Sequence, residues 1–287
     1  NVVFIFLAAD IVDLDIYDCA KLLKKLVDIR NSFRYLSVKN PISIIFAAVI
    51  MLSYGCDSTE TQPTHFGLIT YQGYNYSTVQ IGEQSWFAEN LRSEYYRNAD
   101  EILHVQDDKP WSEAQEGMRC AFNNDDSKAE IYGQLYNGYA VVDERGLCPL
   151  GWHVPSDDDW TDLVAFLSEG IEGIQVEGWN GMADWEVGKM LKSSCCWMPP
   201  HLSSVEGLST PDEYGFTALP AGERGFRGFF SGAENYGSGK WWTASTIEYA
   251  ETRQNEIRYR YLDFRDSELH QASAMKTRGF SVRCVKD

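Results

Sequence analysis

Positive charge is scarce in this sequence of 287 residues. Its 25 Lys and Arg stand against 42 Asp and Glu, which gives a formal net charge of −17. Proteins that bind duplex nucleic acid use clustered Lys and Arg to displace counterions from the phosphates. The charge balance therefore argues against a nucleic-acid partner. It favours solubility at an exposed surface, with binding of divalent cations as the alternative.

The sequence also lacks the short motifs of common catalytic and metal sites. It contains no C-x-x-C zinc pattern, no nucleophile elbow and no phosphate-binding loop. No H-E-x-x-H set occurs among the histidines, which are His65, His104, His153, His201 and His270. We therefore expect no catalytic residue and no cofactor.

One acidic stretch, NNDDSKAE, is a candidate for structural calcium. Its oxygen donors are Asn123, Asn124, Asp125, Asp126 and Glu130. The stretch lacks the glycine and the alternating donors of an EF-hand loop. We expect a solvated turn here, and a calcium site is the alternative.

An apolar run near the N-terminus is too short for a comfortable membrane span. Ile42–Leu52 follows Lys39 and is about a dozen residues long, which suits the core of a signal peptide. The next four residues, SYGC, resemble the lipobox of bacterial lipoproteins, in which the cysteine is lipidated and becomes the mature N-terminus. We expect lipidation at Cys56. A plain cleaved signal and an uncleaved anchor helix are the alternatives.

These features give a domain plan. We interpret residues 1–37 as an extension from a mis-assigned gene start, because a basic amphipathic pattern is unusual before a signal peptide. Residues 38–55 are the expected lipoprotein-type signal peptide, and the polar residues 56–68 are a flexible tether. Residues 69–287 contain no repeat and no low-complexity run, so we expect a single domain.

The cysteines predict one disulfide. The sequence has seven; Cys19 lies in the extension and Cys56 is the lipidation candidate, so an odd number remains. Export permits disulfides. We predict a bond between Cys148 and Cys284, because closing so long a loop removes unfolded-state entropy worth about 4–5 kcal/mol.

The pairing of the other cysteines stays open. Cys195 and Cys196 are adjacent, and a bond between neighbours is strained. One of them is a candidate partner for Cys120.

The stretch LCPLGWHVPSDDDW, residues 147–160, could form a metal site, an acid/base site or the start of a helix. Ser156 followed by Asp159 resembles a capping box, and acidic residues suit the first turn of a helix. Apolar residues then recur at helical spacing, at Trp160, Leu163, Val164 and Leu167. The pattern favours a helix start, with His153 as a packed or hydrogen-bonded strand residue.

Short strands and glycine-rich loops dominate the rest. Residues 74–91 alternate around Gly82, which predicts a β-hairpin, and residues 255–264 and 277–287 alternate as two closing strands. Residues 187–194 follow an amphipathic segment and are expected to end a second helix. The pattern predicts an α+β fold with short twisted antiparallel strands, two helices and long loops rich in glycine and aromatic residues.

Six motifs in order resemble a known family. They are VQIGEQSWFAENL, YGQLYNGYAV, LCPLGWHVPSDDDW, YGFTALPAGERG, KWWTAST and RGFSVRCVKD, and together they resemble the Fibrobacter succinogenes major paralogous domain, which is typical of bacterial cell-surface lipoproteins. The resemblance implies a C-type-lectin-like fold, distantly similar to sulfatase-modifying domains. It also supports the pairing of Cys148 with Cys284, and it implies no catalytic residues.

The expected function is that of a lipid-anchored extracytoplasmic binding or scaffold domain in the bacterial envelope, at the outer membrane or cell surface. A glycan or a surface protein is the expected partner, and the membrane is reached through the lipid. Aromatic residues that could stack on a sugar are Phe229, Tyr236, Trp241 and Trp242. The alternative is that these side chains build the core of their loops. An enzyme distantly similar to sulfatase-modifying domains and a purely structural envelope protein are the alternatives.

Overall fold

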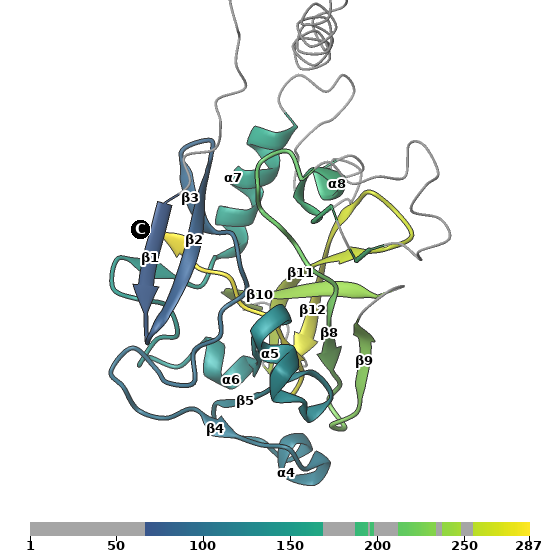
Figure 1. Cartoon of the computed structure of the whole chain (residues 1–287). Helices are drawn as coiled ribbons and strands as arrows, with labels where there is room; N and C mark the ends of the chain where they lie inside the picture. The colour runs from purple at the N-terminus through teal and green to yellow at the C-terminus, as the bar shows by residue number, and fades with distance from the viewer. Residues whose placement is uncertain (1–66, 169–186, 195, 198–211, 234–236, 248–254) are drawn as a thin grey trace, which may run out of the picture. The chain divides into compact units, whose positions relative to one another are not determined.

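The alternating residues at the start of the domain form the predicted hairpin. Strands β2 (Tyr74–Ile81) and β3 (Gln84–Phe87) pair antiparallel around Gly82, whose φ of 57° suits glycine. Strand β1 (Gly67–Tyr71) pairs with β2. With β14 (Val285–Lys286) and β7 (Trp152–His153) these strands form a five-stranded sheet in the order β1-β2-β3-β14-β7 (Figure 1).

The computed structural model describes residues 67–168, 187–194, 196–197, 212–233, 237–247 and 255–287. All of them belong to one compact unit, Gln62–Asp287. The expected extension, signal peptide and nearly all of the tether lie outside the described residues, as do Cys56 and Tyr236. Among the described residues, no helix combines the length and the apolar character needed to span a bilayer.

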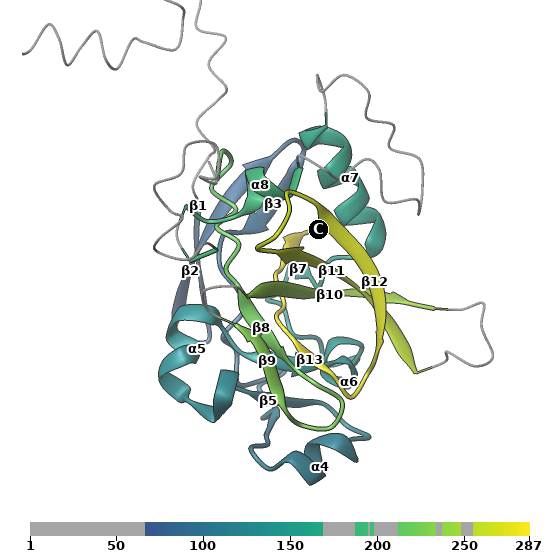
Figure 2. The same cartoon turned by 90° about the vertical axis from the view of Figure 1, so that its right-hand side faces the viewer.

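A larger mixed sheet carries most of the remaining chain. Its strands follow the order β12-β11-β10-β8-β13-β6-β5-β4, and β9 pairs with β8 (Figure 2). The bounds are β4 (Leu103–His104), β5 (Met118–Cys120), β6 (Leu135–Asn137), β8 (Ala221–Arg224), β9 (Phe230–Ala233), β10 (Ser238–Thr246), β11 (Glu256–Asp263), β12 (Leu269–Met275) and β13 (Gly279–Phe280). The expected closing strand over 277–287 is therefore two short strands, β13 and β14, in different sheets.

Five α-helices lie among the described residues, where the sequence predicted two. They are α4 (Asp108–Ser112), α5 (Asp126–Tyr132), α6 (Gly138–Val141), α7 (Asp157–Leu167) and α8 (Val187–Leu191), with a 3₁₀ turn η2 at Phe122–Asn124. The two predicted helices correspond to α7 and α8. The other three are too short to show a helical hydrophobic period. The α+β class is confirmed.

Helix α7 begins as its sequence predicts. The Ser156 hydroxyl accepts a hydrogen bond from the Asp159 N–H, and the Asp159 carboxylate accepts one from the Ser156 N–H at 2.7 Å, which completes the capping box. The apolar stripe that begins at Trp160 is buried against Trp86, Phe216 and Trp241.

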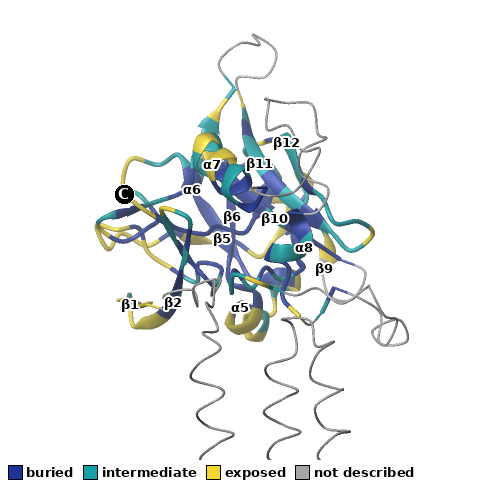
Figure 3. Cartoon of the chain, turned by 90° about the horizontal axis from the view of Figure 1, so that it is seen from above, coloured by how far each residue is buried: buried dark blue, intermediate teal, exposed yellow. Residues whose placement is uncertain are grey.

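Strand β10 is buried over Trp241–Thr243, part of the dark blue interior in Figure 3, whereas Ala244 and Thr246 near its end are exposed. Successive side chains of a strand point to opposite faces. Trp241 accordingly packs with α7 and α8, whereas Trp242 packs with Tyr136, Ile257 and Phe280 on the other side. The two indoles thus belong to two separate hydrophobic clusters.

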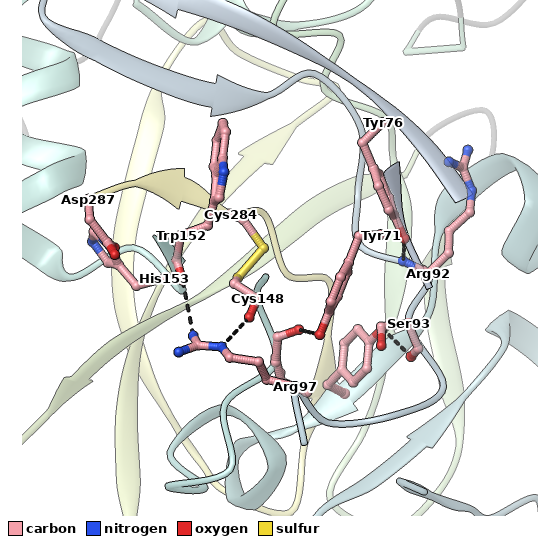
Figure 4. Close-up of a disulfide and its surroundings, with 12 residues drawn as sticks. Tyr71, Tyr76, Arg92, Ser93, Arg97, Cys148, Trp152, His153, Cys284 and Asp287 are labelled. Carbon is pink, nitrogen blue, oxygen red and sulfur yellow. Dashed lines mark hydrogen bonds and ion pairs between the residues drawn. A yellow bond between two sulfur atoms is a disulfide. The ribbon is translucent and has the colours of Figure 1, made fainter. Parts of the chain in front are cut away.

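The predicted disulfide joins Cys148 and Cys284, which are both fully buried (Figure 4). The Arg97 guanidinium donates to the carbonyl oxygens of Cys148 at 2.7 Å and of Trp152 at 3.1 Å, so it fixes the backbone on this side of the bond. Cys120 is buried with a free thiol, so the suggested pairing of Cys120 with Cys195 or Cys196 is wrong.

The start of β1 and the turn between β8 and β9 lie in different parts of the domain. The arrow of β1 starts toward the top of Figures 1 and 2, where the chain enters the described part. The turn between β8 and β9 lies toward the bottom of both views. The hairpin turn and the point of chain entry therefore lie at opposite ends.

Candidate functional site

The turn between β8 and β9, residues 225–229, is built by its glycines. Gly225 N–H donates to the Phe229 carbonyl at 2.7 Å, and Gly228 N–H donates to the Gly225 carbonyl at 2.9 Å. Gly228 has a φ of +95°, and a Cβ there would lie 2.6 Å from the backbone of Asp108. Only glycine fits this position, so the turn conformation is set by the sequence.

A buried arginine, Arg224, joins the turn to a neighbouring segment by hydrogen bonds. The Arg224 guanidinium donates to the Gly228 carbonyl at 2.9 Å and to the Gln106 carbonyl at 2.6 Å, and its side chain is inaccessible to solvent. It also lies over the rings of Trp111, at 4.4 Å, and Phe230, at 4.9 Å. Through Arg224 the hairpin is fastened to the 105–111 segment, which makes the turn a rigid support.

Two phenylalanines are exposed at this support. Phe226 is 36% exposed and Phe229 is 67% exposed, although both sit within a few residues of buried Arg224. They border a shallow hollow of about 220 Å³. The lining residues are Glu223, Gly225, Phe226, Arg227, Phe229, Phe230, Ser231 and Arg278. Exposed aromatic rings beside charged groups are suited to ligand contact.

Glu223 is the acidic residue that lines this hollow, and it pairs with two cations. Its carboxylate lies 3.1 Å from Lys240 Nζ and 2.7 Å from Arg278 Nη1, and it accepts a hydrogen bond from the Ser231 hydroxyl. Burial alone would raise the pKa of Glu223, but these two cations hold it below its ordinary value. Glu223 is therefore ionised at neutral pH, and its carboxylate forms ion pairs with both cations.

A row of half-buried side chains continues from the hollow across the sheet. Lys240, Tyr261 and His270 are cross-strand neighbours on β10, β11 and β12. The rings of Tyr261 and His270 stack with centroids 4.5 Å apart. Tyr259 lies next to Tyr261 on the same face, and burial raises the pKa of its hydroxyl to about 12. The hollow is thus one end of a longer aromatic and polar strip.

Of the aromatic residues predicted to contact a ligand, Phe229 lies in the hollow. The prediction is wrong for Trp241 and Trp242, which are 0% exposed. Their indole N–H groups donate to the Asn90 side chain and the Tyr136 carbonyl, each at 2.8 Å, so both indoles are core residues. Tyr236 lies outside the described residues.

The acidic stretch expected as a turn or calcium site starts a helix. Asp125 caps α5 by accepting hydrogen bonds from the Ser127 N–H and hydroxyl. The Asn124 amide donates to the Gln106 carbonyl, while Asp126 lies 4.0 Å from His104. Across the described ranges no three His, Cys, Asp or Glu side chains gather closely enough to hold a metal ion. The donors Asn123, Asp125, Asp126 and Glu130 therefore form no such cluster.

His153 and two aspartates in the first turn of α7, Asp157 and Asp159, have structural partners. His153 Nδ1 lies 2.7 Å from Asp287 and Nε2 lies 3.1 Å from Asp159, so the ring bridges β7, the C-terminus and the helix cap. Asp157 pairs with Arg258 at 2.7 Å and Arg260 at 3.0 Å on β11. These contacts confirm that His153 is a hydrogen-bonded strand residue.

The sequence interpretation missed Phe226, Arg227, Glu223 and Arg278. A usable indication was present in the segment GERGFRGFF, where closely spaced glycines bound a turn. Apolar residues within so short a turn have little chain around them to cover them. Arg278, however, is far from this segment in the sequence and reaches the hollow only because β13 pairs with β8.

Comparisons with known proteins identify a family. A search of curated proteins and a search of solved structures both found no match. A sequence model of the Fibrobacter succinogenes major domain matches residues 79–286, which span both sheets and the hollow. The chain therefore belongs to the Fibrobacter succinogenes major domain family.

Proposed function

We propose that this protein is a lipid-anchored extracytoplasmic binding domain that recognises a glycan through the β8–β9 hollow. The observation that carries the proposal is Phe229, which is 67% exposed on a turn held rigidly by Arg224. An exposed ring on a preorganised support can stack on the apolar face of a sugar with little loss of conformational entropy. The finer assignment of a C-type-lectin-like fold is part of this proposal.

The shape of the hollow favours a segment of a polymer over a small free ligand. Clefts that enclose small molecules usually measure about 300–1,000 Å³, whereas this hollow is about 220 Å³ and open. The strip of Lys240, Tyr261 and His270 extends the surface beyond it. A glycan chain lying along the strip would place one or two sugars on the phenylalanines.

The charges of the hollow favour binding over catalysis. A general acid needs a carboxyl group with a raised pKa. The pKa of Glu223 is instead lowered by Lys240 and Arg278. An enzyme distantly similar to sulfatase-modifying domains and a purely structural envelope protein remain the competing proposals.

Anchoring rests on Cys56. If Cys56 is the lipidated residue, the variant Cys56→Ala should accumulate as an unprocessed precursor that incorporates no labelled fatty acid. Normal acylation of that variant would contradict the proposed anchor.

A glycan array tests the binding proposal directly. The detergent-solubilised full chain should bind a defined set of glycans, and Phe229→Ala should weaken this binding at least tenfold. Leu150→Ala is the matched control, because Leu150 is 86% exposed and precedes β7 in the other sheet. A blank array, or equal binding by wild type and Phe229→Ala, would contradict glycan recognition at this site. Crosslinking on intact cells would then test for a protein partner.

A further inference from the structure

We infer that the β8–β9 hollow selects glycans that carry anionic groups. The inference rests on the proposed glycan recognition and adds the chemistry of the ligand. Its basis is an excess of positive charge: Arg227 and Arg278 line the hollow, whose one lining carboxylate is Glu223, and Lys240 on β10 also pairs with that carboxylate. This excess lies in a chain whose formal net charge is −17.

Arg227 is the cation available to a ligand. It is exposed at the tip of the turn and lies over the Phe226 ring, 5.3 Å from the centroid. Among the described residues no carboxylate pairs with it, whereas Lys240 and Arg278 are paired with Glu223. A guanidinium can donate two parallel hydrogen bonds to a carboxylate or sulfate.

Arg278 is held in place beside it. Its Nη1 bonds Glu223 at 2.7 Å, and its guanidinium lies 5.8 Å from the centroid of Phe226, the ring that also contacts Arg227. Both guanidiniums therefore lie close to the same phenylalanine ring. Arg278, held by Glu223, is positioned before a ligand arrives, so among these cations Arg227 is the side chain that a ligand would have to order.

The negative net charge of the protein means that attraction of an anionic polymer has to come from a local group of cations. A surface of net negative charge repels polyanions at long range. Binding of an anionic polymer would therefore depend on a local cluster of cations. Since exposed charges are screened by salt, that binding should also weaken as ionic strength rises.

The test uses matched pairs of polymers and the detergent-solubilised full chain. The pairs are polygalacturonate with its methyl ester, and dextran sulfate with dextran; affinity is measured by titration at low and high salt. At low salt at least one charged polymer should bind about tenfold more tightly than its neutral partner, which corresponds to about 1.4 kcal/mol. Preference for polygalacturonate indicates a carboxylate ligand, and preference for dextran sulfate indicates a sulfate ester.

Variants separate the inference from the proposed function. Arg227→Gln should remove most of the preference for the charged polymer, measured as the ratio of the affinities for the charged and the neutral polymer. The control Lys286→Gln removes one positive charge from an exposed position on β14, in the other sheet, and should keep the preference. Melting temperatures of both variants should match that of the wild type, since both side chains are exposed.

Two negative results have different meanings. If no charged polymer binds more tightly than its neutral partner, or if Arg227→Gln has no effect, the anionic selectivity is wrong. Binding that still depends on Phe229 would in that case leave the proposed function intact. If none of the four polymers binds and the glycan array is blank, both proposals fail.

Discussion

Single aromatic residues in this protein have two distinct roles, which their exposure separates. Trp241 is enclosed between Trp160 and Arg283, whose guanidinium lies 5.8 Å from the indole centroid, and its N–H bonds Asn90. Phe229 lies on a surface turn. The same residue class therefore supplies stability at one position and a contact surface at the other.

A pair of substitutions should show this division. Trp241→Ala leaves a large cavity and removes one of the two hydrogen bonds that the Asn90 oxygen accepts, so we expect it to lower the free energy of unfolding by about 3–5 kcal/mol. Phe229→Ala should change it by less than about 0.5 kcal/mol. Urea denaturation of both variants measures the two values. Equal losses would mean that Phe229 is part of the fold and not a free contact residue.

Buried polar residues were the hardest single positions to anticipate. Arg283 is 1% exposed, donates to the backbone carbonyls of Phe216 and Thr217, and lies 4.0 Å from the Phe216 ring centroid. Burial lowers the pKa of its guanidinium to about 9. Arginine is rarely so buried, and the residues that accommodate it come from distant parts of the chain. Local sequence patterns carry no information about such partners.

Secondary-structure elements differ in how far their own residues predict them. Helix α7 has a capping box, an acidic first turn and an apolar stripe within 156–167, and the β2–β3 hairpin has alternation and a glycine turn. Both were predictable because these features are local. Trp241 and Trp242 of β10 are buried on opposite faces, so they show no alternation, and the sequence could not distinguish them from surface aromatic residues.

The capping box predicts a pH dependence. Burial alone would raise the pKa of Asp159, but hydrogen bonds from Ser156 and His153 hold it below its ordinary value. A carboxyl whose pKa is lower in the folded state stabilises the fold above the unfolded pKa of about 3.9 and loses this effect as pH falls. Asp159→Asn should therefore cost about 1 kcal/mol at pH 7 and clearly less at pH 3.

The measurement is urea denaturation of the variant and the wild type at both pH values. Asp158→Asn is the matched control, because Asp158 is exposed in the same helical turn and takes no part in the capping box. A difference between Asp159→Asn and wild type that stays constant from pH 7 to pH 3 would contradict the proposed ionised cap.

At the scale of the whole molecule, the disulfide closes the fold. Cys148 and Cys284 are separated by 136 residues, so the bond encloses most of the larger sheet, including the β8–β9 hairpin. In the unfolded chain it removes the conformations of a very long loop. The bond thus stabilises the arrangement of the two sheets as a whole, since Cys284 directly precedes β14 of the smaller sheet.

Removing the disulfide should therefore be costly. The double variant Cys148→Ala/Cys284→Ala should lose about 2–5 kcal/mol of unfolding free energy. The control is Cys120→Ala, which removes a buried free thiol and no crosslink. Urea denaturation under non-reducing conditions gives both values. A loss in the double variant no larger than twice that of Cys120→Ala would mean that the crosslink itself contributes nothing.

The chain enters the described domain at the end opposite the β8–β9 turn, and this arrangement affects which surface an anchored domain can present. If Cys56 carries the proposed lipid, the anchored chain enters the domain at β1, so the anchor leaves the phenylalanine-bearing turn at the other end free to face away from the bilayer (Figure 1). Contact would then be made with material away from the lipid surface. Shortening the tether should leave such contact intact. Moving the anchor to the β8–β9 hairpin would direct this turn toward the bilayer and abolish the contact.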